Sequence, residues 1–217
     1  MPECKELLAA LATLIASFAG AWAAFALEGH QRKRESEAKN IGASNRAIYT
    51  VFNLWNVLEQ YRKEVLEPFR GKSDAWLNLA ANPTIPVGES RFQVGELQFL
   101  LQTPHAEVFA KLMLEEQRFA LAMDLIRARS SLVLGKVFPS MAAAKIEVGQ
   151  SAIPSEIERA IGIDVTHTLK ELTLSIYANV DEDLTSLKNT YEQLTKAMKA
   201  IYPRQKFLKI EFQGPAQ

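Results

Sequence analysis

The stretch LLAALATLIASFAGAWAAFAL, residues 7–27, decides the architecture that this sequence predicts. It holds 21 consecutive residues without a charged side chain, and nine of them are Ala. An α-helix of this length is about 31 Å long, close to the ~30 Å hydrocarbon thickness of a bilayer. The sequence therefore predicts a transmembrane helix near the start of the chain.

Two other interpretations of this stretch fit the sequence less well. A secretion signal needs a positively charged start and an apolar run of only about 7–15 residues before its cleavage site. Here the start, MPECKE, carries Glu3 and Glu6 against Lys5, although Ala24-Phe25-Ala26 resembles a cleavage site. A helix of a soluble core seldom runs this long without a charge.

The basic residues around the predicted span set its orientation. Arg32, Lys33, Arg34 and Lys39 follow it, whereas Lys5 alone precedes it. Cytoplasmic flanks are enriched in Lys and Arg, so the N-terminus is expected outside and residues 28–217 in the cytoplasm. We accordingly expect a single-pass protein of the cell inner membrane, with Arg32, Lys33 and Arg34 as its topology anchor.

Small and bulky side chains occupy different faces of the predicted span. The small face, which we expect to contact other helices, comprises Ala12, Thr13, Ala16, Ser17, Gly20 and Ala24. Small residues four apart let helix backbones approach closely in lipid, and the hydroxyl groups can bond across helices. An Ala-rich span also produces this spacing by chance, but the paired hydroxyls favour a homo-oligomer.

The bulky face gives the span its candidate pore-lining or gate residues, Phe18, Trp22 and Phe25. If copies pack through the small face, these rings face lipid. If copies pack through the bulky face, the rings plug a central lumen. The sequence leaves both arrangements open.

The remaining sequence predicts long helices, so the fold class is all-α, with the span continuing into a bundle. Gly29 and Gly42 are expected to act as hinges between the two. The predicted segments are an N-terminal segment with the span (1–28), a basic juxtamembrane hinge (29–42), a cytoplasmic helical bundle (43–202) and a C-terminal tail (203–217).

Hydrophobic periodicity and breaker residues position the helices of the bundle. The first pattern is Val51, Leu54, Leu58, Tyr61 and Val65, ending near Pro68. A loop over residues 71–90 should be pinned by Trp76, Leu77 and Leu79, and Ser90 should cap a short helix to about Leu101. Two more long helices are expected, one from Thr103-Pro104 to a kink or end at Pro139, the other from about Val165 to Pro203. The apolar seam of this last helix comprises Val165, Leu169, Leu172, Ile176, Val180, Leu184, Leu187, Tyr191, Leu194, Met198 and Ile201. Of the rest, the tail KFLKIEF alone resembles a strand.

The helix after Pro104 carries a seam of alternating three- and four-residue steps, which predicts packing against partner helices. Its members are Phe109, Leu112, Glu116, Phe119, Met123, Ile126, Ser130, Val133 and Val137. Glu116 interrupts the apolar pattern, so we expect a buried polar seam there. Its carboxylate would need a partner such as Arg118, Arg127 or Arg129.

Residues that carry chemistry are sparse. The single cysteine, Cys4, excludes an intramolecular disulfide and a Cys-based zinc cluster. No phosphate-binding, nucleophile or zinc-protease motif occurs, and the one weak metal candidate is Asp164 with His167. With 25 basic and 25 acidic side chains, no global field favours nucleic acid. We predict no enzyme, no catalytic residues, no metal and no cofactor.

The layout resembles that of bacterial inner-membrane proteins with one N-terminal span, a basic stop and a helical cytoplasmic region. This resemblance implies no defined activity. The stretches that carry it are LATLIASFAGAWAAFALEGHQRKRE, LMLEEQRFALAMDLIRARS and KAMKAIYPRQKFLKIEF. In architecture alone, the chain is similar to single-span effectors of bacterial phage-defence systems, such as the Hailong channel. That resemblance implies an oligomeric channel controlled by the cytoplasmic domain.

The sequence thus predicts a homo-oligomeric pore-forming effector of the antiviral-defence type, gated by its cytoplasmic bundle. The alternative is a membrane-tethered adaptor that docks a cytoplasmic partner and forms no pore. The expected partners are other copies of the chain and the lipid bilayer, with a cytoplasmic protein or a small signalling ligand as a further candidate.

Overall fold

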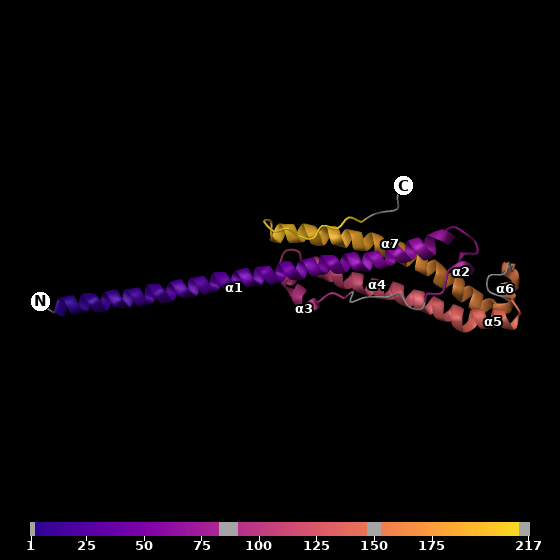
Figure 1. The fold of residues 1–217 in the computed structure, drawn as a ribbon, viewed down its shortest axis with the longest axis horizontal. Helices are drawn as coiled ribbons and strands as arrows, with labels where there is room; N and C mark the ends of the chain where they lie inside the picture. Colours follow the sequence, from indigo (N-terminus) through magenta and orange to yellow (C-terminus); the bar gives the residue numbers. More distant parts are fainter. Residues whose placement is uncertain (1–2, 83–90, 147–152, 213–217) are drawn as a thin grey trace. The chain divides into compact units, whose positions relative to one another are not determined.

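The computed structural model describes residues 3–82, 91–146 and 153–212, with the backbone alone for residues 3–12. These residues are helical or irregular and contain no strand, which confirms the predicted all-α class. The α-helices are α1 (Glu3–Tyr61), α2 (Ala75–Asn78), α3 (Val94–Leu97), α4 (Ala106–Leu132), α5 (Phe138–Ala143), α6 (Pro154–Ile161) and α7 (Ile163–Ile201) (Figure 1). Two π-helical segments (Arg62–Leu66 and Val133–Val137) and two 3₁₀ segments (Glu67–Phe69 and Gln98–Gln102) complete the set.

The chain divides within α1 into two units, Met1–Ala43 and Ser44–Gln217. In the first unit α1 passes through Gly29 and Gly42 without a break, so the expected hinge positions are helical in this structure. The side chains from 13 to 36 are exposed.

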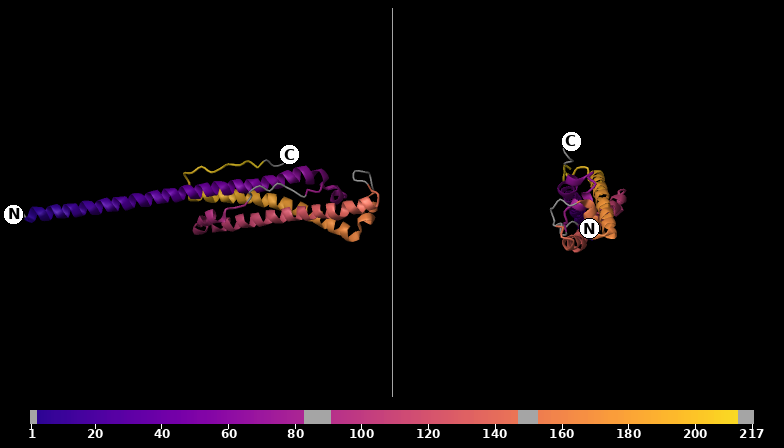
Figure 2. Two further views of the ribbon diagram at one scale, coloured as in Figure 1. Left: turned by 60° about the horizontal axis from the view of Figure 1, so that its bottom comes forward. Right: turned by 90° about the vertical axis from the view of Figure 1, so that its right-hand side faces the viewer.

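The second unit is a bundle in which residues 44–61 of α1, α4 and α7 lie side by side (Figures 1 and 2). Each helix buries one apolar stripe, as the periodicity predicted. All five residues of the first predicted pattern are buried, which confirms it: Val51, Leu54, Leu58, Tyr61 and Val65. On α7, seven residues of the predicted pattern are buried, namely Leu169, Ile176, Val180, Leu184, Leu187, Leu194 and Met198. The other four, Val165, Leu172, Tyr191 and Ile201, are half-buried.

Both π-helical segments end two residues before a proline. Arg62–Leu66 precedes Pro68, and Val133–Val137 precedes Pro139. Proline lacks a backbone N–H, and its ring crowds the carbonyl of the preceding turn, so a wider turn relieves the clash. The first long helix thus ends near Pro68, and the predicted interruption at Pro139 is confirmed.

A second apolar cluster closes the end of the bundle around Trp76 of α2. Its other buried members are Val133, Val137, Met141, Ile157, Ile161 and Leu169. Trp76 and Leu79 are buried and Leu77 is half-buried, so these residues pin the described part of the predicted loop. The rest of that loop, with the expected cap Ser90, lies outside the described residues.

Two predicted features, the start of α4 and the conformation of the tail, differ from the structure. α4 begins at Ala106 rather than at Thr103, because Thr103 Oγ1 accepts a hydrogen bond from the His105 amide (3.2 Å) in a preceding turn. The tail is extended but not a strand. Its Leu208 and Ile210 amides donate to Asn45 Oδ1 (2.9 Å) and the Tyr191 hydroxyl (3.0 Å), so side chains replace a partner strand.

Candidate functional site

The residues predicted to span the membrane form an exposed apolar surface on α1. Phe18, Trp22 and Phe25 are 78%, 74% and 73% exposed. Helical geometry places them on the side opposite Ala16, Gly20 and Ala24. Thr13 and Ser17 are exposed beside the small residues, while the Ala12 side chain lies outside the described residues.

The predicted span begins at Leu7, and the side chains of residues 7–12 lie outside those described. Within the described residues, no helix is both long and apolar enough to cross a membrane.

The basic residues after this surface are exposed. Arg32 forms an ion pair with Glu28 one turn earlier, while Lys33 and Arg34 extend from the same helix. A Cβ atom built at Gly20 or Gly29 meets no other atom within 4 Å. Neither glycine is therefore required by a close packing contact within the described structure.

The expected buried carboxylate is corrected by one residue. Glu116 is half-buried and accepts a hydrogen bond from the Phe92 amide (3.1 Å), not from an arginine. The buried carboxylate is its neighbour Glu115, which is 2% exposed. Val108 is likewise buried while Phe109 is half-buried, so the buried stripe lies one residue earlier than predicted at these positions. Farther along α4, Leu112 and Phe119 are buried as predicted.

Glu115 belongs to a buried polar layer between α4 and α7. Its Oε1 accepts hydrogen bonds from the hydroxyls of Ser186 (2.5 Å) and Thr190 (3.0 Å). Arg118 of α4 donates to Ser186 Oγ (2.7 Å). The layer also contains Asp183, which is 4% exposed.

The two acids of this polar layer are incompletely bonded. Glu115 Oε2 and Asp183 Oδ2 are both buried without a hydrogen-bond partner among the described residues. Burial, with a further contribution from the nearby Glu115 carboxylate, raises the pKa of Asp183 to about 6 against the opposing effect of Arg118. The layer can therefore take up a proton under mildly acidic conditions.

A buried cation, Arg129, lies farther along α4 and is 1% exposed. It donates to the Trp76 carbonyl (2.9 Å), the Ala80 carbonyl (3.5 Å) and Thr173 Oγ1 (3.1 Å). No carboxylate pairs with it among the described residues. Burial lowers the pKa of Arg129. Burial also raises the pKa of the Tyr61 hydroxyl to about 12, although the positive charge of Arg129 opposes this rise.

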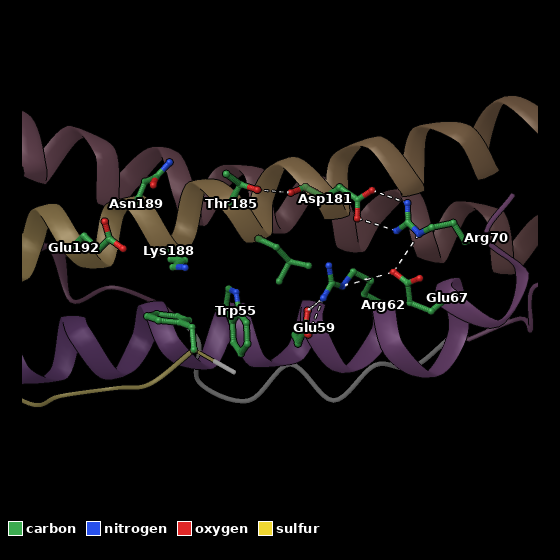
Figure 3. Close-up of a pocket in the computed structure, with 12 residues that line it drawn as sticks. Trp55, Glu59, Arg62, Glu67, Arg70, Asp181, Thr185, Lys188, Asn189 and Glu192 are labelled. Atoms are coloured by element: carbon green, nitrogen blue, oxygen red, sulfur yellow. Dashed lines mark hydrogen bonds and ion pairs between the residues drawn. The ribbon is translucent and has the colours of Figure 1, made fainter. Parts of the chain in front are cut away.

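Figure 3 shows a groove of about 620 Å³ between the end of α1 and the middle of α7. Trp55 and Glu59 face Asp181, Thr185 and Lys188 across it. Phe212 of the tail contributes to one wall, packing edge-on against Trp55 with 5.0 Å between ring centroids.

Ion pairs occupy one end of this groove. Arg70 binds Asp181 through two parallel hydrogen bonds of 2.9 Å, and its Nε donates to Glu67 (3.1 Å). Arg62 donates to Glu59 (2.8 Å). The lining holds four carboxylates and three cations, so it offers no net positive charge to an anion. This arrangement joins the segment after α1 to α7 and does not resemble a catalytic centre.

No cluster of three potential metal-ligating side chains occurs in the part of the chain that the structure describes. Asp164 and His167 are exposed on α7. His105 lies 3.9 Å from Glu107, and His30 is exposed on α1.

No protein-family model, curated protein or solved structure matches this chain.

The sequence pattern did not predict that the side chains of Glu115, Asp183 and Arg129 are buried. A signal was present on α4, because Glu115, Ala122 and Arg129 also repeat at seven-residue intervals beside the apolar seam. On α7 the seam included Leu184, and Asp183 directly precedes it. A charged residue next to an apolar seam is usually solvated, so spacing alone did not identify these as buried.

Proposed function

We propose that this chain is a homo-oligomeric single-pass membrane protein whose bundle gates a pore formed by the N-terminal helices. The observation that carries the proposal is the exposed apolar surface of α1. Leu14, Ile15, Phe18, Trp22, Phe25 and Leu27 are all exposed, and no charge occurs from residue 13 to residue 27. A large exposed apolar surface is typical of a membrane or protein interaction site.

The small face supports association of these helices with one another. Ala16, Gly20 and Ala24 leave the backbone accessible, and Ser17 adds a hydroxyl that can bond across helices. Packing through this face would turn Phe18 and Trp22 towards lipid, whereas packing through the bulky face would place them at the lumen as its gate.

The basic cluster supports an orientation with the bundle in the cytoplasm. Arg32, Lys33 and Arg34 are exposed directly after the apolar surface. Basic residues at this position favour the cytoplasmic side and contact anionic headgroups. The proposal therefore assigns the chain to the bacterial inner membrane, in a role like that of the defence effectors that it resembles in architecture.

Ion efflux from liposomes tests the pore. The full chain, reconstituted in K⁺-loaded vesicles, should release K⁺ faster than empty vesicles do. Phe18→Ala combined with Trp22→Ala should raise efflux several-fold where these rings form the gate, and should leave efflux unchanged where the helices pack through the small face. Tyr49→Ala, which truncates an exposed ring in the bundle, is the matched control and should leave efflux unchanged. Absence of efflux from every variant would contradict the pore.

The alternative function is a membrane-tethered adaptor, and a feature of α4 favours it. Leu114 and Leu121 are exposed seven residues apart, on the side of α4 that faces away from the seam. Such a pair can dock another helix. A stoichiometric partner that is lost in Leu121→Glu, and retained when the span is replaced by an unrelated one, would favour the adaptor.

A further inference from the structure

A second pocket, of about 550 Å³, lies between α7 and the segment that follows α1. The turn at Gly71, where φ is +77°, positions Arg70 and Lys72 at its edge. Lys170 and Tyr177 of α7 line the opposite side.

The charge of this pocket differs from that of the groove in Figure 3. Its lining includes Arg70, Lys72 and Lys170, and no carboxylate is among the described residues that line it. From outside the pocket, Asp181 and Glu67 pair with Arg70, and Glu158 pairs with Lys170. Lys72 forms no ion pair with the described residues; it lies 5.2 Å from the centroid of the Phe69 ring.

Arg129 adds positive charge directly behind the wall. Its guanidinium donates to the Trp76 carbonyl (2.9 Å) and to Thr173 Oγ1 (3.1 Å), and both of these residues line the pocket. A buried cation without a paired carboxylate projects its field over several ångströms, because the interior screens it weakly. An anion in the pocket would lower the electrostatic free energy of Arg129.

The rest of the lining is largely apolar and aromatic. Trp76 and Tyr177 contribute rings, and Leu174 is an exposed apolar side chain at the rim. Lys170 lies 4.9 Å from the Trp76 ring centroid, and Arg70 lies 5.1 Å from that of Tyr177. A ligand suited to this lining combines a negative group with a flat apolar part.

We infer that this pocket binds a small organic anion that combines a phosphate group with a flat ring system in one molecule, as a nucleoside monophosphate does. The inference deepens the proposed function, because it names the class of small ligand to which the bundle responds. Binding is measured without a pore, so its failure and the failure of the efflux experiment are distinguishable.

Titration calorimetry on the full chain in detergent tests the inference with four probes. AMP and phenyl phosphate carry both features, whereas adenosine and inorganic phosphate each carry one. We expect AMP and phenyl phosphate to bind saturably with a Kd below about 1 mM in 150 mM NaCl. Adenosine and inorganic phosphate should each bind at least tenfold more weakly than AMP.

Two charge reversals make a matched pair. Lys72→Glu should weaken AMP binding at least tenfold, whereas Lys188→Glu, at the groove of Figure 3, should leave it unchanged. Both side chains are exposed, so neither change disturbs the core. Leu174→Glu should weaken binding as Lys72→Glu does.

Three results would overturn the inference. The first is that neither aromatic phosphate saturates below 10 mM. The second is that adenosine binds as tightly as AMP. The third is that Lys72→Glu and Lys188→Glu weaken AMP binding equally, which would indicate a general charge effect instead of this pocket.

Discussion

Four charged side chains are buried among the described residues, and Glu59 is paired with Arg62 and Lys63. The other three, Glu115, Asp183 and Arg129, form no ion pair within the described structure. Each lies where α4 meets α7 or the segment after α1. Burying a charge costs free energy unless hydrogen bonds or an opposite charge compensate it. These residues are therefore the most informative single positions to change.

Asp183→Asn should stabilise the protein above pH 6. The pKa of Asp183 is about 6 in the folded state against 3.8 as its ordinary value, so the folded state binds more protons between these pH values. Stability consequently falls as pH rises from about 4 to 6, by roughly 3 kcal/mol. Asn removes this loss, and the variant's advantage should disappear towards pH 4.

Denaturant unfolding of the full chain between pH 4 and pH 8 measures this effect. Asp124→Asn is the control, because Asp124 is an exposed partner of Arg127 and should show little change. An Asp183→Asn variant no more stable than the unaltered chain at pH 7.5 would argue against a buried, raised-pKa carboxyl.

Arg129→Ala should destabilise the bundle by about 3 kcal/mol or more, because it leaves a cavity and the Trp76 carbonyl loses its donor. Arg127→Ala, two residues away and exposed, should cost less than about 0.5 kcal/mol. The same unfolding measurement compares the two. Equal effects would show that Arg129 makes no structural contribution of its own.

At the scale of elements, breaker residues and hydrophobic steps predicted most of the helices. The step from Val51 to Val65 identified the buried face of α1. Pro68 lies just after the π-helical segment that follows α1, and Pro139 lies in α5, just after the π-helical segment that follows α4. The π-helical turns before both prolines were not predicted, because a single wider turn hardly changes the spacing of the apolar residues along the helix.

The start of α4 and the state of the tail also escaped prediction. Thr103 was expected to open a helix, but its hydroxyl closes a turn with the His105 amide instead. The tail alternates as a strand does, but its amides bond Asn45 and Tyr191 side chains. The start of α4 depends on local turn geometry, and the conformation of the tail depends on contacts with residues distant in sequence. The spacing of apolar residues contains neither kind of information.

The turn after α1 gives a prediction at this scale. Gly71 has φ of +77°, a conformation that L side chains rarely adopt. Gly71→Ala should therefore destabilise the protein by about 1 kcal/mol or more. Gly95→Ala in α3 is the control, because its φ is ordinary and no atom lies within 4 Å of an added Cβ. It should be neutral or slightly stabilising by thermal unfolding; an equal loss in both variants would refute the argument.

At the scale of the whole molecule, the sequence predicted the all-α class, which the described residues confirm. The candidate pockets were not predictable, since they assemble residues as distant as Lys72 and Lys170. Membrane insertion and the pore remain proposals that stand on the residues of α1.

The proposed coupling through Gly29 and Gly42 predicts an effect on gating. Alanine at both positions should stiffen α1, because each Gly→Ala change favours the helix by about 1 kcal/mol. We expect ligand- or voltage-triggered K⁺ efflux to fall several-fold while protein incorporation into vesicles is unchanged. Efflux equal to that of the unaltered chain would contradict the hinge.

Self-association of α1 in a membrane is the central claim, and disulfide cross-linking tests it most directly. With Cys4 replaced by Ser, single cysteines are placed at positions 14–27 and at Glu35, and the full chain is oxidised in native membranes. The account predicts covalent dimers with helical periodicity, strongest at Ala16, Gly20 and Ala24 and weak at Glu35. Uniformly weak cross-linking at all positions, or recovery of the chain outside the membrane fraction, would contradict it.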